Sequence, residues 1–334
     1  EKQTIHYDQL VKEFIRNDLT NFQRLYLKDK EVRNVILLGD FLTDTIFHAD
    51  MRDAIITREE FNRRYEAIMD KPAHMLAKEL NIDPEYATLV VPTMVIYQSF
   101  LDLFGAEAMW APGIALVDGI AFDYGERCKF LKSEHKFEND ILVASTEISH
   151  RYAVDHEHIK GTAKLALAIF DSTKKIHGMG SRERLMLQIA VQLHDCGKYL
   201  SMSNVAENSY RIIMETEIIG LSNRERSVIG HAVRYNTSEF PSLGDMNLDA
   251  EIDTEQYLLI GKLTAILRLA NAMDRSHYQK VEKMKASYKD GALQLSIDST
   301  RDFSLEMGLL KDKVEFFEEV FGIKLVLRRK KKIQ

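Results

Sequence analysis

The feature that most constrains this chain is a long succession of segments whose apolar residues repeat with helical spacing. Six such segments follow one another between residues 139 and 275. A helix with one apolar stripe must bury that stripe, so consecutive amphipathic helices pack together around a shared core. The segments are Asn139–Arg151, Glu157–Phe170, Arg182–Leu193, Ser209–Ile218, Asn223–Tyr235 and Glu255–Arg275. This part of the chain is therefore predicted to be a helical domain.

A short α/β element is predicted after these helices. Leu293–Ile297 alternates apolar and polar residues, which is typical of a strand, and Ile323–Leu327 is a second short apolar run. Leu309–Phe321, which lies between them, has helical spacing. The pattern predicts a strand, a helix and a strand at the C-terminal end of the domain.

The first 124 residues have a mixed pattern. The short apolar runs Glu31–Phe41 and Met109–Ile114 are typical of strands. Thr57 followed by Glu60 is a helix-start pattern. Helices are predicted after it to residue 69, over 72–80 and 86–104, and from 116 onward. These residues are also more acidic than the rest of the chain.

We therefore expect two domains, residues 1–124 and 125–334, with the boundary near Asp123–Gly125. The predicted fold class is α+β and mostly helical.

Composition excludes several classes of protein. The chain has 334 residues, 45% of them hydrophobic, which is ordinary for a globular protein. No apolar run is expected to reach the roughly 20 residues that span a bilayer, so no membrane is predicted. A net charge of −6 argues against general nucleic-acid binding. Two distant cysteines, Cys128 and Cys196, favour a reducing, cytoplasmic location.

The strongest chemical signal is His194-Asp195 at the end of a predicted helix, followed by Cys-Gly-Lys. His158 lies in the first turn of an earlier helix, and Asp274 lies at the end of a later one. Imidazole and carboxylate are common ligands of divalent cations. The four residues are therefore candidate metal ligands. The alternative is structural, with His194 as a core histidine and Asp195 paired with Lys198.

The order His, His-Asp, Asp resembles the HD superfamily of metal-dependent phosphohydrolases. The resemblance implies that His158, His194, Asp195 and Asp274 hold a divalent metal, Mg²⁺ or Mn²⁺, whose bound water attacks phosphorus. It also implies a catalytic role for Lys198, which matches a family position that steadies a phosphate or a leaving group.

One branch is closer still. The segments HIKGTAKLALAIFD, LHDCGKYLS, EIIGLSNRERSVIGHAVRYN and LTAILRLANAMDRS resemble the exopolyphosphatase / guanosine-pentaphosphate phosphatase family. MWAPGIALVDGIAFDYG and LEMGLLKDKVEFFEEVFGIKLVL are also similar to that family. The resemblance implies part of an actin-like (ribonuclease H-like) α/β lobe, then an all-α HD-type domain with the C-terminal element. It further implies polyphosphate or guanosine pentaphosphate as substrate, and a homodimer.

The sequence departs from that family in one respect. The Asp-x-Gly-Gly-Gly-Ser loop of the family's second lobe has no equivalent here, nor does the first lobe. We therefore expect a C-terminal portion whose partner is the missing N-terminal lobe of the same protein, inactive alone as an exopolyphosphatase. Gly39-Asp40 lies where the family has a phosphate-binding turn, although an ordinary strand–turn explains it equally well.

Several cations are candidate anion-binding residues. Arg224 and Arg234 lie on one predicted helix, Arg275 follows Asp274, and Arg328 and Arg329 begin a basic run near the C-terminal end. The alternatives are an exposed, salt-bridged helix face for the first two and a solvated tail for the last two.

Three functions remain open on the sequence alone. The first is a part of a phosphatase that hydrolyses terminal phosphoanhydride bonds. The second is a non-catalytic module that binds polyphosphate or a guanine-nucleotide alarmone. The third is a self-sufficient HD phosphohydrolase.

Overall fold

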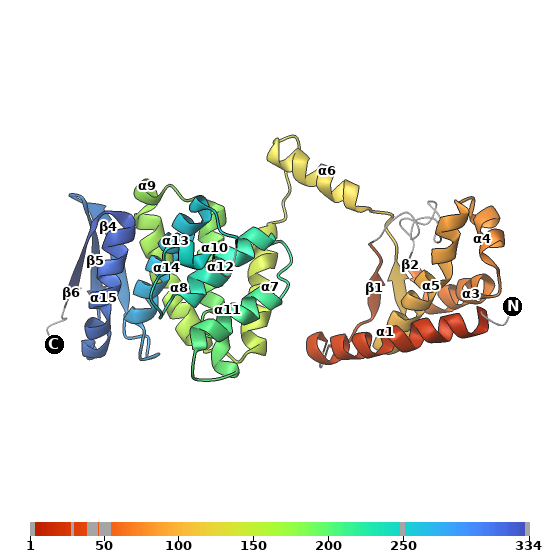
Figure 1. The fold of residues 1–334 in the computed structure, drawn as a ribbon, viewed down its shortest axis with the longest axis horizontal. Coiled ribbons are helices and arrows are strands. Elements are labelled where there is room, and N and C mark those ends of the chain that lie inside the picture. The colour runs from red at the N-terminus through yellow and green to blue at the C-terminus, as the bar shows by residue number, and fades with distance from the viewer. Residues whose placement is uncertain (1–3, 28–29, 39–45, 47–54, 248–250, 331–334) are drawn as a thin grey trace. The chain divides into compact units, whose positions relative to one another are not determined.

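The structure is a computed structural model, and it describes residues 4–27, 30–38, 46, 55–247 and 251–330. The chain forms two compact units, Glu1–Glu134 and His135–Gln334 (Figure 1). The residues expected near the boundary, Asp123–Gly125, lie inside a helix that ends at Arg127. Gly125 is buried there because the Leu131 side chain packs where its Cβ would stand.

The first unit contains a three-stranded sheet and five described helices. Strand β3 (Ala108–Trp110) is central, parallel to β1 (Asn34–Ile36) and antiparallel to β2 (Ile55–Thr57). The helices are α1 (Thr4–Tyr26), α3 (Arg58–Met69), α4 (Ala73–Leu80), α5 (Pro84–Phe104) and α6 (Leu116–Arg127). Thr57 caps α3 by accepting a hydrogen bond from Glu60 N, as the sequence pattern predicts.

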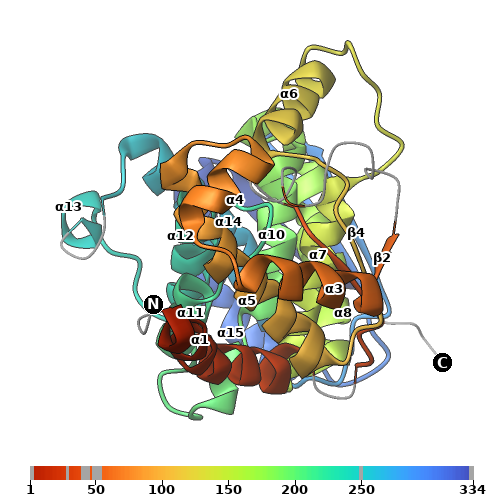
Figure 2. The ribbon, with the colours of Figure 1, turned by 90° about the vertical axis from the view of Figure 1, so that its right-hand side faces the viewer.

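Helix α5 corrects one expectation. Of the described residues, it is the one helix long and apolar enough to cross a membrane by length and composition. The expectation that no apolar segment reaches that length is therefore wrong. Helices α1, α3 and α4 contact α5 (Figure 2), and Val90, Met94 and Leu101 are fully buried. A core helix meets the same criterion of length and composition.

The second unit is built on helices that surround one long buried helix, α14 (Thr254–Met273). Helices α8, α10, α12 and α15 contact it, and nearly every side chain from Ile260 to Met273 is buried. The other helices are α7 (Phe137–Arg151), α8 (His156–Ser172), α9 (Lys174–His177), α10 (Ser181–Leu193), α11 (Val205–Glu215), α12 (Asn223–Arg234), α13 (Leu243–Met246) and α15 (Ser304–Phe321).

A three-stranded sheet forms the C-terminal part of this unit. Strand β5 (Ala292–Asp298) pairs antiparallel with β4 (Lys283–Lys289) and parallel with β6 (Lys324–Lys330). Helix α15 connects β5 to β6, so these elements form a β-α-β unit. Leu293, Leu295 and Ile297 point to one face of β5 and are fully buried in the core.

The predicted elements are found with shifted ends, and several described elements were missed, the short helices α9 and α13 among them. The strand predicted over Met109–Ile114 stops at Trp110, because Pro112 lacks an N–H and Gly113 turns the chain with a φ of 67°. Strand Ile323–Leu327 extends to Lys330, so Arg328 and Arg329 lie in a strand rather than a frayed tail. Helix α1 and strands β2 and β4 were not predicted from the sequence.

Candidate metal centre and adjoining cavity

Three helix ends of the second unit bring the predicted ligands together. His158 lies in the first turn of α8, whose N-cap Asp155 accepts hydrogen bonds from the backbone N–H groups of Glu157 and His158. His194 is the C-cap of α10, and Asp274 is the C-cap of α14. Contacts among these three helices join residues more than 100 positions apart in the sequence.

Two imidazoles and one carboxylate form a compact, buried group. The Nε2 atoms of His158 and His194 lie 3.3 Å apart. Asp195 Oδ1 lies 3.7 Å from His194 Nε2, and Asp195 Oδ2 lies 4.0 Å from His158 Nε2. One ligand atom of each residue lies within 4.8 Å of the others. The three residues are 0%, 2% and 8% exposed in chain order, so water solvates them little.

The hydrogen bonds fix where the imidazole protons are. His194 Nδ1 donates to Val191 O at 2.7 Å, and His158 Nδ1 donates to the acceptor-only carboxylate of Asp274, also at 2.7 Å. In neutral imidazoles both Nε2 atoms therefore carry lone pairs, and these face each other. Two nitrogens that each bind one cation at about 2.1 Å lie roughly 3.0–3.4 Å apart. The donor set and the observed separation both fit a divalent cation.

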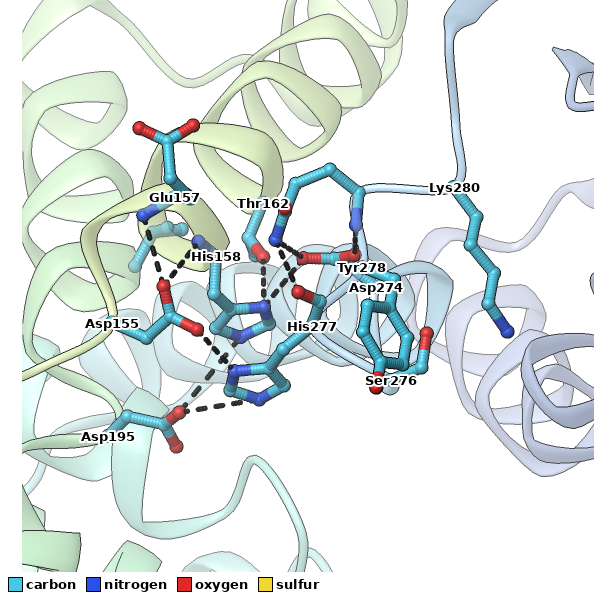
Figure 3. A network of polar contacts seen from close by, with 12 residues as sticks. Asp155, Glu157, His158, Thr162, Asp195, Asp274, Ser276, His277, Tyr278 and Lys280 are labelled. Atoms are coloured by element: carbon cyan, nitrogen blue, oxygen red, sulfur yellow. Dashed lines mark hydrogen bonds and ion pairs between the residues drawn. The ribbon is translucent and has the colours of Figure 1, made fainter. Parts of the chain in front are cut away.

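Asp274 lies behind this group rather than in it. Its carboxylate is 2% exposed and accepts hydrogen bonds from His158 Nδ1, Gln279 N and Gln279 Nε2 (Figure 3). The sequence predicts Asp274 as a metal ligand, but the group of three contains only His158, His194 and Asp195. In this arrangement Asp274 orients the imidazole of His158, as carboxylates behind metal-binding histidines commonly do.

Lys198 pairs with one of the predicted ligands. Its Nζ lies 2.5 Å from Asp195 Oδ2 and 3.4 Å from His277 Nε2. Burial alone raises the pKa of the Asp195 carboxyl, but attraction to His194 when that imidazole is protonated, together with the hydrogen bond and charge of Lys198, outweighs burial and lowers that pKa to about 2. The carboxylate is therefore ionised at neutral pH and available to a cation.

Burial sets the protonation of the neighbouring groups. It lowers the pKa of His194, so this imidazole is neutral at neutral pH. It raises the pKa of the Cys196 thiol to about 12, so Cys196 stays protonated and packs as an apolar side chain.

The chain can turn sharply after His194-Asp195 because residue 197 is a glycine. A Cβ on Gly197 would stand 2.2 Å from Val205 O and 2.7 Å from Ser209 N. Ser209 fills the junction: its hydroxyl accepts from Gly197 N and donates to His194 O, both at 2.8 Å. This close approach of α11 holds the end of α10 in place.

His277 also belongs to the site, and sequence reasoning missed it. Its ring stacks on that of His158, with centroids 3.7 Å apart and planes 11° apart. Its Nδ1 donates to Asp155 Oδ2 at 3.1 Å (Figure 3). Burial and the neighbouring His158 lower the pKa of His277, so its Nε2 faces Lys198 as an acceptor. The sequence does contain one indication of its role, because His277 is only three residues after the predicted ligand Asp274.

A cavity of about 650 Å³ opens beside the centre. His194, Asp195, Lys198 and His277 line one part of it, and Arg234 and Arg275 are among the other lining residues. Arg234 is held by Glu207, 2.7 Å from its Nε, and lies over the Tyr210 ring. The cavity therefore places cationic groups beside the His/Asp group.

The remaining predicted anion-binding residues lie outside this cavity. Arg224 pairs with Asp253 and Glu255, which matches the salt-bridged alternative. Arg328 is exposed on β6, and Arg329 donates to Arg301 O at 2.6 Å. Gly39 and Asp40 lie outside the described residues.

Two imidazoles and a carboxylate are a ligand set that could hold a divalent cation. The cationic groups that line the adjoining cavity are of the kind that bind phosphate. A family model described as Ppx/GppA phosphatase, domain III, matches residues 143–316. The chain belongs to the Ppx/GppA phosphatase family, which confirms the family resemblance predicted for the C-terminal part. No curated protein matches the chain.

Proposed function

We propose that this chain is part of a phosphatase that hydrolyses terminal phosphoanhydride bonds of polyphosphate or guanosine pentaphosphate, and that the main catalytic lobe of the family is not in this chain. We also propose that His158, His194 and Asp195 hold a divalent cation, Mg²⁺ or Mn²⁺, where an HD-type domain acts on the phosphate chain. One observation carries the cation site: two imidazole lone pairs face each other at 3.3 Å beside an ionised carboxylate. Membership of the Ppx/GppA family supports the substrate class.

Different residues of the chain would orient the metal ligands and bind the phosphate. A bound divalent cation would lower the pKa of a water molecule and neutralise phosphoryl charge. Asp274 and Val191 O hold the two imidazoles with their lone pairs turned toward each other. Lys198, at the wall of the cavity, is positioned to neutralise charge on a departing phosphate. His277 accepts from Lys198 and so restrains the direction of its ammonium group.

For residues 1–124 we propose the later part of the family's second actin-like lobe. The mixed sheet, with α5 running into the central strand β3, supports this interpretation. A homodimer and a cytoplasmic location remain part of the proposal, on the resemblance and on cysteine content.

One observation favours a second candidate, a regulatory module that binds the same anions without cleaving them. Lys198 already neutralises Asp195 at 2.5 Å, so the ammonium competes with a metal for the carboxylate. If the ammonium stays there, the site binds phosphate through its cations and holds no metal.

The decisive experiment measures phosphate release by the 334-residue chain after metal removal and reconstitution with Mn²⁺. Tripolyphosphate and guanosine pentaphosphate serve as separate substrates. We expect no exopolyphosphatase activity from this chain alone, so phosphate released here would come from the HD-type domain. That release should depend on Mn²⁺, be abolished by Asp195→Ala and be retained by Asp171→Ala. Asp171 is a suitable control because it pairs with Arg184 on the surface. Release at an unchanged rate by Asp195→Ala would contradict the proposed site. Tight binding of both compounds with no release would favour the regulatory module.

A further inference from the structure

A small recess opens from the cavity beside the metal centre. Its volume is about 170 Å³. Four residues, Asn236, Thr237, Asn271 and Arg275, line both the recess and the larger cavity. The rest of its lining is Arg268, Ala272, Leu309 and Lys313. A ligand that occupies the larger cavity can therefore extend into the recess.

Arg268 is fixed in this recess without an acidic partner. It is 6% exposed, and its Nε donates to Tyr235 O at 2.8 Å. Its Nη2 donates to Ser238 O, and the guanidinium lies 4.2 Å from the centre of the Phe316 ring. Burial lowers the pKa of Arg268 to about 10, so the group is still charged at neutral pH. Both partners of its N–H groups are neutral carbonyls.

Two further cations surround the recess. Lys313 on α15 is half-buried, and Arg275, just beyond the end of α14, is exposed. Within the ranges that the structure describes, neither forms an ion pair with a carboxylate. Burial, together with the nearby charge of Arg268, lowers the pKa of Lys313. Asp312 acts in the opposite direction on Lys313 but does not outweigh these two effects. The recess thus gathers three positive charges, none of which forms an ion pair with a carboxylate of the described residues.

Several cations elsewhere in the same unit are paired with carboxylates: Arg182 binds Glu225, Arg184 binds Asp171, and Lys280 binds the buried Glu306. The half-buried Arg226 and Lys262 instead donate to uncharged oxygens, as Arg268 does, but neither is among the residues that line this recess. Like charges that line one recess repel one another, and burial of an unpaired charge is costly. An anion from solution would offset that repulsion.

We propose that the recess is a second anion subsite, which holds a phosphoryl group of a ligand whose other end lies at the metal centre. This deepens the proposed function and rests on it for the role of the metal centre. The ligand class is an oligophosphate with at least two phosphoryl groups. The recess is well below the roughly 300–1,000 Å³ of pockets for larger organic ligands, so it admits phosphoryl groups rather than a nucleoside.

The test is calorimetric titration of the metal-free 334-residue chain with tripolyphosphate. Lys313→Gln is the test variant, since Lys313 is only half-buried, and a thermal melt of the variant checks that its fold is intact. Lys311→Gln is the matched control because Lys311 is exposed on the same helix and does not line the recess. We expect the Kd to rise about tenfold for Lys313→Gln and to stay within twofold for Lys311→Gln, since a charged hydrogen bond is lost only in the first.

Two additional titrations separate the subsite from the metal centre and identify the source of the phosphate. Asp195→Asn should bind tripolyphosphate as tightly as wild type or more tightly, because it frees Lys198 and leaves the recess unchanged. Guanosine pentaphosphate should show the same tenfold loss with Lys313→Gln if its phosphates enter the recess. A loss confined to tripolyphosphate assigns the recess to linear polyphosphate. Equal affinities of Lys313→Gln and wild type for both compounds would overturn the subsite. If the protein binds no metal but Lys313→Gln still raises the Kd for tripolyphosphate, only the proposed metal centre is overturned.

Discussion

The metal centre and the cationic recess adjoin one cavity but are built in opposite ways. The centre is a closed network in which each polar side chain has a partner: Asp274 holds His158, Val191 O holds His194, and Lys198 holds Asp195. The recess gathers Arg268, Lys313 and Arg275, which have no carboxylate partners among the described residues. One end presents donor atoms for a cation, and the other presents charge for an anion.

The largest expected effect concerns the donor atoms themselves. His194→Asn removes one of the two facing lone pairs, so we expect Mn²⁺ affinity to fall at least 100-fold. Calorimetric titration of the metal-free protein measures this directly. His150→Asn is the matched control, because His150 is exposed at the end of α7 and lies outside the group of three. Equal affinities for His194→Asn and wild type would mean that the centre is not a metal site.

The next effect is on stability. Gly197→Ala would place a Cβ 2.2 Å from Val205 O, so the turn Cys196–Tyr199 and α11 must separate. We expect a loss of about 3 kcal/mol in the free energy of unfolding. Gly308→Ala in α15 meets nothing within 4 Å and should stabilise by up to about 1 kcal/mol. Denaturant titration of both variants checks the contrast, and an equal response would show that the close approach is relieved at little cost.

Asp274→Asn tests the orienting role of the carboxylate behind His158. A neutral amide holds the His158 tautomer less firmly, and we expect metal affinity to fall about 10- to 100-fold. If Asp274 were instead a direct ligand, the loss would match that of His194→Asn. Titration with Mn²⁺ under identical conditions compares the two variants.

The smallest expected effect concerns the free energy of unfolding that the ion pair between Arg182 and Glu225 contributes in the same unit. Arg182 binds Glu225 through two N–H groups, and although burial raises the pKa of Glu225, the Arg182 and Ser222 hydrogen bonds lower it to about 2. A depressed carboxyl pKa stabilises the fold above its unfolded value of 4.5, and this contribution is lost as pH falls toward 2.

Glu225→Gln should therefore be less stable than wild type by about 1–2 kcal/mol at pH 7, and the difference should shrink below pH 4.5. Unfolding curves at pH 7 and pH 3 measure it. A difference that is the same at both values would show that the ion pair contributes nothing to stability.

The sequence was sufficient for elements whose pattern is local. The apolar spacing of α8, α10 and α14 predicted these helices, and the order of histidines and aspartates selected His158, His194 and Asp195. Strand β4 was missed although Met284, Ala286 and Tyr288 alternate with polar residues, because its lysines mask the pattern. Helix α1 was missed although its apolar residues, such as Leu10, Phe14 and Ile15, recur at helical spacing between charged ones.

The sequence could not predict contacts between residues that are far apart along the chain and close together in space. Asp274 as a ligand stays a prediction, and only the packing of α14 against α8 shows that its carboxylate accepts a hydrogen bond from His158 Nδ1. The recess joins Arg268 and Lys313 from two helices, and no spacing along the chain reveals that they line one recess. His277 required knowledge of the turn after Asp274, where its φ is 58°.

The most direct test of the central claim is anomalous diffraction from crystals of the 334-residue chain soaked with Mn²⁺. We predict one strong anomalous peak about 2.2 Å from the Nε2 atoms of both His158 and His194, with Asp195 as a further ligand. A peak at another location, or none beside these imidazoles at saturating Mn²⁺, would contradict it.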